Sequence, residues 1–479
     1  MIKNSRIHNK GMILWGILLI LVFAVGCFLK SGYIFCKYED SAEFAQNEAR
    51  RQGVIEGDII DRNGNIIMKP TAPVKEKNEP TVVHPAYSHL LGFNSTGHGR
   101  SALRKLCYED LYSDLETGKG ATIQLTIDDN LQSKAFDYIK NGVDGSPIRG
   151  SIVVLDAKTG DILTMTSRNY MDFEPETIDE NYKKYVTINE FFLNYPTDVP
   201  EAPGSVYKLV TACAAIEKGY ENYIYNDVNY NGKYLIDGKE ELTIYNHKAV
   251  RENVFGDINM QLALDSSLNT YFASLGVEKL GEGVVREYAK KFLISTSRPK
   301  NGGYERLDLG FAKLPSYIGF NYGKFNLASL CYGQGELAVT PLHIAMIGQT
   351  IANDGNMKMP SLIDKVIYPD GSEQLSQRLT DPPAPIKAET AQKLKNYLVN
   401  TSMGIFRKDL GLTDKEGNAV RVYSKTGTAE LGRNDDICHA YLMCMTDDYV
   451  VLISSNRTYA SGSSHRDIAE GLLRTLYSE

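Results

Sequence analysis

The chain has 479 residues, of which 43% are hydrophobic and 23% are charged, and its formal net charge at neutral pH is −7. This composition excludes a disordered or fibrous protein, and the length predicts two or three domains. Beyond the first 30 residues the chain holds 48 basic and 59 acidic residues. This excess of acidic residues is not typical of proteins that bind nucleic acids, so no nucleic-acid partner is predicted.

An uncharged, apolar segment, GMILWGILLILVFAVGCFL, occupies residues 11–29. At 1.5 Å per residue it reaches about 28 Å, enough to cross the hydrocarbon core of a bilayer. Lys3, Arg6 and Lys10 precede it, so the positive-inside rule places the N-terminus in the cytoplasm and the rest of the chain outside. We therefore predict a cytoplasmic tail and a single transmembrane helix within residues 1–32. A cleaved signal peptide, or a lipoprotein signal at AVGC, is the alternative.

Residues 33–120 show short strand and turn signals and predict a small, non-catalytic α+β domain. In GDIIDRNGNIIMK, residues 57–69, the pair Asn63-Gly64 stands between two apolar runs. Asn-Gly in this position is a strong signal for a β-hairpin. The later stretch, residues 88–115, is predicted to be partly helical with a glycine-rich break.

Residues 121–479 predict one α/β domain. The segment 122–142 predicts a short strand followed by a helix from about Asp129. Residues 151–167 predict two strands around a turn at Gly160. Strands recur near the C-terminus on both sides of Asp447-Asp448 and precede a last helix that starts near Ser464. Strands at both ends and helices between them predict a sheet that joins the two ends of this domain.

Two further features of this domain carry structural expectations. Residues 171–203 contain four prolines and many polar residues, so we expect a long excursion without regular elements. None of the seven cysteines forms a Cys-x-x-Cys pair, which argues against a zinc site, and no metal is predicted. Cys213 lies in an apolar run and is expected in the core. Cys438 and Cys444 are the nearest candidates for a disulfide.

The search for chemistry begins with motifs that are missing. The chain has no His-Glu-x-x-His, Gly-x-Ser-x-Gly or P-loop motif, so zinc peptidases, α/β-hydrolases and P-loop enzymes lose support. Three short motifs that each carry a hydroxyl or an amine do occur in order. They are Ser205-x-x-Lys208 before an apolar run, Ser267-x-Asn269 beside a helical stretch, and Lys425-Thr426-Gly427-Thr428 on a predicted strand.

Each motif also has decoys, and their contexts remove them. Ser297 and Lys300 flank a proline within a loop, Lys158-Thr159-Gly160 is itself a hairpin turn, and two Ser-x-Asn matches lie outside the required order. Those two matches begin at Ser167 and Ser454.

The ordered set resembles the active-site motifs of class B penicillin-binding proteins, the anchored peptidoglycan transpeptidases. The stretches that match these motifs are PGSVYK, SSLNTYFASLG and SKTGTAE. Further matches to the family occur at DRNG, HLLGF, LTIDDNLQ, VVLDAKTGDIL and GQGELAVTPLHIA. The resemblance covers nearly everything after the anchor, and the short region before residue 121 is similar to compact members that lack a large dimerisation insert. It implies a penicillin-binding, serine β-lactamase-like transpeptidase domain, with an antiparallel sheet flanked by helices, over 121–479. A pedestal domain over 33–120 would precede it.

Three stretches depart from the family pattern. Glu56 stands where an arginine is usual, and NEFF at 189–192 replaces an Asn-Arg-Ala stretch. GRSALR, residues 99–104, replaces Gly-x-Ser-Gly-Leu-Glu. These departures concern the packing of the first domain and the route to the site rather than the three motifs.

The chemistry of the motifs is that of an acyl transferase. One helical turn holds Lys208 beside Ser205, and a neutral lysine can take the serine's proton. Burial and a nearby cation such as Lys425 would lower the pKa of Lys208, and the helix N-terminus adds a positive field. The oxyanion would be held by backbone N–H groups of Ser205 and, by resemblance, Thr428.

The resemblance implies roles for the remaining residues. Ser267 would relay a proton to the leaving group, and Asn269 would orient Lys208 and the substrate amide. The terminal carboxylate of the substrate would be bound by Lys425 and by the hydroxyls of Thr426 and Thr428, which flank Gly427.

The predicted reaction is D,D-transpeptidation of peptidoglycan stem peptides that end in D-Ala-D-Ala, with β-lactams as acylating inhibitors and no cofactor. The predicted site is extracytoplasmic on a membrane-anchored chain, with a lipid-linked glycan polymerase of the shape-elongation-division-sporulation type as a further partner.

A β-lactam-hydrolysing or β-lactam-sensing protein shares the motifs and is the alternative. A hydrolase would need a group that activates water, and no Glu-x-x-Leu-Asn follows the second motif. A non-enzymatic partner of the polymerase is a third reading.

Overall fold

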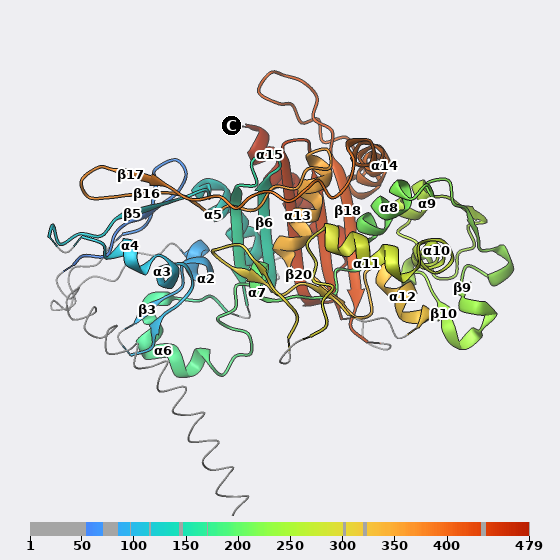
Figure 1. The fold of residues 1–479 in the computed structure, drawn as a ribbon, viewed down its shortest axis with the longest axis horizontal. Coiled ribbons are helices and arrows are strands. Elements are labelled where there is room, and N and C mark those ends of the chain that lie inside the picture. Colours follow the sequence, from blue (N-terminus) through green and yellow to red (C-terminus); the bar gives the residue numbers. More distant parts are fainter. Residues whose placement is uncertain are drawn as a thin grey trace, which may run out of the picture.

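A central sheet of five antiparallel strands organises the larger part of the molecule (Figure 1). The computed structural model describes residues 54–69, 85–95, 97–114, 116–142, 147–169, 171–299, 303–319, 323–432 and 437–478. In the order β18-β19-β20-β6-β7, the sheet joins residues near both ends of the predicted catalytic domain, as expected. Its strands are β6 (Gly150–Asp156), β7 (Ile162–Arg168), β18 (Tyr423–Glu430), β19 (Cys438–Met445) and β20 (Tyr449–Thr458).

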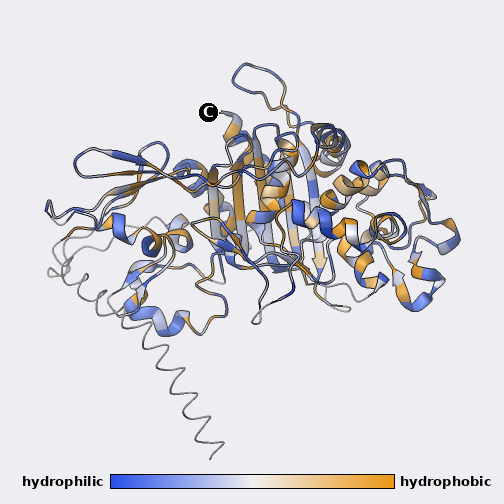
Figure 2. Ribbon diagram, in the orientation of Figure 1, coloured by the Kyte–Doolittle hydropathy of each residue, from blue (hydrophilic) through white to orange (hydrophobic). Residues whose placement is uncertain are grey.

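Helices cover both faces of this sheet. Helices α5 (Asp129–Asn141) and α15 (Arg466–Ser478) pack together on one face, over an apolar cluster that includes Ile139, Ile453 and Leu472. The opposite face carries α8 (Lys208–Glu217), α13 (Pro341–Ala352) and α14 (Ala388–Phe406). All twelve residues of α13 are buried, which makes it the core helix of this layer, and Figure 2 shows its apolar surroundings. The predicted α/β class with an antiparallel sheet flanked by helices is therefore confirmed.

A helical lobe beside β18 completes the larger part of the molecule (Figure 1). It consists of α9 (Met260–Asp265), α10 (Asn269–Leu275), α11 (Gly281–Lys291) and α12 (Lys324–Cys331). Short two-stranded pairs connect them: β8 (Tyr225–Asn226) with β11 (Asp257–Ile258), β9 (Tyr234–Leu235) with β10 (Thr243–Ile244), β12 (Leu307–Asp308) with β13 (Lys313–Leu314), and β14 (Tyr317–Ile318) with β15 (Leu337–Ala338). The lobe and the sheet edge form the two walls of the cavity described below.

A second sheet, in the order β17-β16-β5-β1-β2, lies to one side of the central sheet (Figure 1). Strands β1 (Ile59–Ile60) and β2 (Ile66–Met68) form the hairpin that Asn63-Gly64 predicts, with Gly64 at a positive φ of 87°. Strands β5 (Thr122–Leu125), β16 (Ile363–Ile367) and β17 (Glu373–Leu375) complete it. The sheet thus takes strands from both sides of residue 120, where we predict the domain boundary.

The remaining N-terminal elements are short. They are α2 (Ser88–Leu91), β3 (Asn94–Ser95), β4 (Gly99–Arg100), α3 (Ala102–Leu106) and α4 (Tyr108–Leu111). The predicted membrane segment, residues 11–29, lies outside the described residues. Within the described ranges, no helix combines the length and apolarity that spanning a bilayer requires.

The expectation for residues 171–203 is wrong, because this segment contains helices α6 (Ile178–Tyr185) and α7 (Tyr195–Asp198). Prolines predict breaks in a helix interior, but Pro196 lies in the first turn of α7 and Pro175 in the first turn of the short helix before α6. Proline is tolerated there, because those N–H groups have no partner within the helix.

Aromatic packing fixes this segment against the N-terminal region. Phe173 and Phe191 are buried with Phe93, and their ring centroids lie 4.4 to 6.4 Å from neighbouring aromatic rings. Two phenylalanines of the NEFF stretch, Phe191 and Phe192, belong to this aromatic cluster. Glu190 of the same stretch binds Arg149 at 2.6 Å. This departure from the family pattern therefore builds a local interface of its own.

The two other departures compensate one another. Glu56 replaces an expected arginine, and Arg104 replaces an expected glutamate at the end of GRSALR. In the structure Arg104 donates two hydrogen bonds to the Glu56 carboxylate, at 3.0 and 2.6 Å, and both side chains are buried. The two departures thus place opposite charges in contact, with the carboxylate at position 56 and the guanidinium at position 104.

The candidate disulfide is absent. Cys438 and Cys444 lie on the same strand, β19, with free thiols. Residues six apart on a strand are separated by roughly 20 Å, which no disulfide can bridge. Cys213 is fully buried, as expected.

Candidate active site

Ser205 lies in a 3₁₀ turn, Gly204–Tyr207, that runs directly into helix α8. The α-helix itself begins at Lys208, three residues later than the serine. Gly204 has a positive φ of 56°, and a Cβ there would lie 2.9 Å from the carbonyl carbon of Thr428. Only glycine lets the backbone approach β18 so closely. This approach sets the serine beside the strand.

Lys208 is fully buried and points at Ser205. Its Nζ lies 2.8 Å from Ser205 Oγ, 2.6 Å from the carbonyl oxygen of Ser267 and 2.8 Å from Asn269 Oδ1. Burial, and then the charge of Lys425, hold the pKa of Lys208 well below its usual range. A neutral amine in this position can accept the proton of the serine hydroxyl.

Ser267 and Asn269 come from the junction between α9 and α10. Ser267 has φ +53°, an uncommon left-handed conformation for serine, and its Oγ lies 3.4 Å from Lys208 Nζ. Asn269 is the first residue of α10 and donates from Nδ2 to the carbonyl oxygen of Tyr245 at 3.1 Å. The bend between the two helices thus presents both side chains to Lys208.

Lys425 reaches the same cluster from β18. Its Nζ donates to Ser267 Oγ at 3.0 Å, and burial lowers the pKa of Lys425 to about 8. Side chains alternate along a strand, and Thr426 and Thr428 line the cavity. Gly427 faces away, where a Cβ would lie 2.9 Å from the carbonyl oxygen of Pro203.

The five reactive side chains of the three motifs therefore meet, although the motifs are separated by more than 50 residues of sequence. Ser205 and Lys425 are linked through Lys208 and Ser267 by contacts of 2.8 to 3.4 Å. The predicted decoys lie elsewhere. Ser297 Oγ bonds Ser295 Oγ, Ser454 Oγ bonds Ser151 Oγ, and Lys300 lies outside the described residues.

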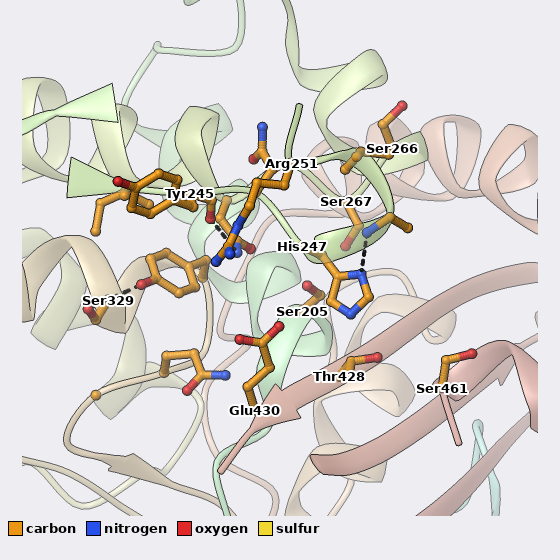
Figure 3. Close-up of a pocket in the computed structure, with 18 of the residues that line it drawn as sticks. Ser205, Tyr245, His247, Arg251, Ser266, Ser267, Ser329, Thr428, Glu430 and Ser461 are labelled. Carbon is orange, nitrogen blue, oxygen red and sulfur yellow. Dashed lines mark hydrogen bonds between the residues drawn. The ribbon is translucent and has the colours of Figure 1, made fainter. Parts of the chain in front are cut away.

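A cavity of about 980 Å³ opens in front of Ser205, between β18 and the helical lobe (Figure 3). Sequence reasoning missed much of its wall, including Tyr245, His247, Arg251 and Glu430. The first three lie in a loop without periodicity, so no pattern marks them. Glu430 could have been found, because it follows Thr428 by two residues and so shares its face of the strand.

Gly333, between the wall residues Tyr332 and Gln334, packs against the turn that holds Ser205. A Cβ at Gly333 would overlap the carbonyl oxygen of Gly204, and Gly204 N–H donates to the carbonyl oxygen of Gly333 at 2.9 Å. Gly333 belongs to the GQGELAVTPLHIA stretch. The resemblance of this stretch to the family does not by itself assign a role to any of its residues. The structure assigns the glycine a steric role in seating this turn.

Comparisons with known proteins agree on one family. Residues 150–473 match the family model described as the penicillin binding protein transpeptidase domain. The chain is 26% identical over 379 residues to peptidoglycan D,D-transpeptidase PbpA of Mycolicibacterium smegmatis, covering 72% of this chain and 71% of that protein. It is 29% identical over 317 residues to penicillin-binding protein PbpB of the same organism, covering 65% and 45%.

Solved structures show the same fold. The imipenem acyl-enzyme complex of penicillin-binding protein A from M. tuberculosis superposes with a TM-score of 0.75 at 21% identity, covering 90% of this chain and all of that one. The D,D-transpeptidase domain of a peptidoglycan glycosyltransferase from Eggerthella lenta has a TM-score of 0.73 at 22% identity, covering 89% and 99%.

Proposed function

The chain belongs to the penicillin-binding protein transpeptidase family, and we propose that it is a peptidoglycan D,D-transpeptidase with Ser205 as its nucleophile. The observation that carries the proposal is the buried amine of Lys208, 2.8 Å from Ser205 Oγ at the wall of an open cavity. A serine hydroxyl needs a base within hydrogen-bond reach, and a buried lysine with a lowered pKa supplies one.

The reaction has two halves that use the same residues. Lys208 takes the proton of Ser205, whose oxygen attacks the carbonyl carbon of the bond between the two D-alanines. The C–N bond breaks, and the proton passes from Lys208 through Ser267 to the departing amine of D-alanine. An acceptor amine then attacks the ester and gives its proton to Lys208. The C–O bond to Ser205 breaks, which restores the hydroxyl and leaves a cross-link.

Groups in the cavity wall would bind the carboxylate of the substrate and the oxyanion of the intermediate. Backbone N–H groups of Ser205 and Thr428 would hold the oxyanion, where each donor contributes roughly 3–4 kcal/mol to the transition state. The terminal carboxylate of the donor peptide would bind Lys425 and the hydroxyls of Thr426 and Thr428. Asn269, which accepts from Lys208 at 2.8 Å, would orient that amine.

Labelling with benzylpenicillin tests the nucleophile. Intact-mass analysis should show one penicilloyl adduct, and peptide mapping should place it on Ser205. Ser205→Ala should abolish the adduct, while Ser297→Ala, the matched control in the decoy motif, should retain it. An adduct that survives in Ser205→Ala would refute the assignment.

The adduct should persist for many minutes, because the motifs supply no group to activate water. Sustained turnover of a chromogenic β-lactam would favour the β-lactamase alternative.

The arrangement in the cell is part of the proposal. Residues 1–32 would anchor the chain in the cytoplasmic membrane, with the pedestal (33–120) and the transpeptidase domain (121–479) outside. This rests on the apolar segment 11–29 and the basic residues before it. A lipid-linked glycan polymerase would supply the strands to be cross-linked. Protease added to intact cells without a wall should digest residues 33–479, and full protection would contradict this topology.

A further inference from the structure

Glu201 is a largely buried carboxylate in the segment that enters the nucleophile turn. It stands four residues before Ser205, and 12% of its side chain is exposed. Its backbone pairs with Val339 in both directions: Glu201 N–H donates at 3.3 Å, and Val339 N–H donates to the Glu201 carbonyl oxygen at 2.8 Å. The chain then passes through Pro203 into the turn Gly204–Tyr207. A shift at Glu201 is therefore passed on to Ser205, although the mechanism described above gives this carboxylate no role.

Side chains from β19 and β20 surround the Glu201 carboxylate. One oxygen, Oε2, lies 2.9 Å from His439 Nδ1, and the other, Oε1, accepts a hydrogen bond from Asn456 Nδ2. Tyr441 follows His439 by two residues and so shares its face of β19. Burial, and then the charge of Glu201, raise the pKa of the Tyr441 hydroxyl well above its usual range. The carboxylate thus ties the segment before the nucleophile to two strands of the central sheet.

This anchor lies next to the strand that would supply the second oxyanion donor. In the pairing of β18 with β19, His439 stands opposite Ala429, the residue after Thr428. The nucleophile turn meets the same stretch of β18, since a Cβ on Gly204 would lie 2.9 Å from the carbonyl carbon of Thr428. The spacing between the backbone N–H groups of Ser205 and Thr428 therefore depends on how the segment before the nucleophile is held against the sheet.

We propose that Glu201 is a positioning residue for acylation, which acts through His439 and Asn456 on the gap between the nucleophile turn and β18. Donors help a transition state most when they already point at the oxygen that becomes charged. A misplacement of about 1 Å can cost about 100-fold in rate, and hydrogen bonds to a carboxylate are shorter and stronger than neutral ones. A charged anchor therefore holds the N–H groups of Ser205 and Thr428 on one oxygen more firmly than an amide does. This inference rests on the proposed function, which assigns those two groups to the oxyanion.

Glu201→Gln tests the proposal, because it keeps the shape of the side chain and removes its charge. Acylation of the full chain is followed by intact mass over a range of benzylpenicillin concentrations, which separates the first-order acylation constant from the initial binding constant. The acylation constant should fall about 30-fold and the binding constant should stay within about twofold, since Lys425 and Thr426 are untouched. His439→Asn should lower the same constant. The double variant should lose little more than Glu201→Gln alone, because both changes act through one contact.

A boronic acid reports on the oxyanion site directly. The boron atom of phenylacetamidomethylboronic acid takes up the Ser205 oxygen while the serine proton passes to Lys208, which leaves a negatively charged tetrahedral group where the intermediate would form. Its dissociation constant should rise in Glu201→Gln by about the factor by which the acylation constant falls. An unchanged dissociation constant would overturn the proposal.

Glu56→Gln is the matched control, because it removes the charge of another buried carboxylate, whose partner Arg104 does not line the cavity. It should lower the midpoint of urea unfolding and leave both constants unchanged. Unchanged constants in Glu201→Gln, a loss of acylation that Glu56→Gln shares, or a change confined to the binding constant would overturn the proposal. If Glu201→Gln does not fold, His439→Asn, which leaves the carboxylate in place, decides by the same measurements. Failure of benzylpenicillin to acylate Ser205 in the wild-type chain would instead reject the proposed function.

Discussion

Arg104 near the N-terminal hairpin and Lys208 in the cavity are both buried cations, but their surroundings differ in kind. Arg104 shares two hydrogen bonds with the Glu56 carboxylate, and both side chains are at most 5% exposed. Lys208 is fully buried, and its amine forms hydrogen bonds with neutral oxygens. Within the described residues, no carboxylate lies at salt-bridge distance from Lys208 or from Lys425.

The charge of Arg104 stabilises the fold through its ion pair, whereas the surroundings of Lys208 favour the loss of its proton and so serve catalysis. A buried ion pair preserves both charges, because each stabilises the ionised form of the other. A buried lysine next to a second cation loses its proton readily instead, which is what a general base for a serine requires. The two regions can be told apart by removing one charged side chain from each.

The largest effect is expected for Lys208→Met, which keeps the length of the side chain and removes the base. Acylation by benzylpenicillin should slow by about 1000-fold, within the range that general base catalysis contributes. Stability should change little, because the cost of burying the amine disappears together with its hydrogen bonds. The measurements are the acylation rate constant by intact mass and the midpoint of urea unfolding.

Lys395→Met is the matched control. Lys395 is also buried, but it lies at 2.7 Å from both Asp354 and Asp447. Its loss should lower the free energy of unfolding by about 1 kcal/mol, since these partners are half exposed, and should leave acylation within a few-fold of wild type. Equal losses of acylation in the two variants would show that any buried lysine matters and would refute the special role of Lys208.

The next effect concerns the ion pair of Glu56 with Arg104. Glu56→Ala should lower the free energy of unfolding by about 3 kcal/mol, because the Arg104 guanidinium is left buried without a counter-charge. The double exchange Glu56→Arg with Arg104→Glu should recover most of that loss. Urea denaturation measures both, with the exposed Asp308→Ala as a control that leaves the midpoint unchanged. A double variant no better than the single one would show that direction matters as well as pairing.

These contrasts also explain what could be predicted from the sequence. The strands β19 and β20 follow from runs of apolar residues, and Ser205 beside Lys208 follows from local spacing on a turn. That Ser267 bridges Lys208 and Lys425 depends on long-range packing, which no spacing encodes. The order of the three motifs, through the family resemblance, supplied that grouping.

The failures have physical causes of the same kind. Glu56 and Arg104 are 48 residues apart. In the sequence each is only a departure from the family pattern, and their contact becomes visible only in the folded structure. Pro175 and Pro196 predict breaks, yet both occupy first turns, where proline fits a helix. Tyr245, His247 and Arg251 belong to a loop whose form depends on the helices around it.

The last of these effects, and the one that ties the two lysines together, is the pH dependence of acylation. The rate should rise with pH as Lys208 loses its proton, since only the neutral amine accepts the proton of Ser205. Burial lowers the pKa of Lys425 to about 8, so above that pH the cation that would hold the β-lactam carboxylate is lost. The rate should then fall by about tenfold per pH unit, which gives a bell-shaped profile of the acylation rate constant.

Lys425→Arg isolates the alkaline limb. A guanidinium group stays protonated far above pH 8, so the fall in rate should disappear up to about pH 10. The acid limb should remain, because a positive charge still lies near Lys208 and keeps the pKa of its amine low. Stopped-flow rates from pH 5 to 10 on folded protein measure both limbs. An alkaline limb that stays near pH 8 in Lys425→Arg would assign it to another group and would separate the two lysines that the cavity brings together.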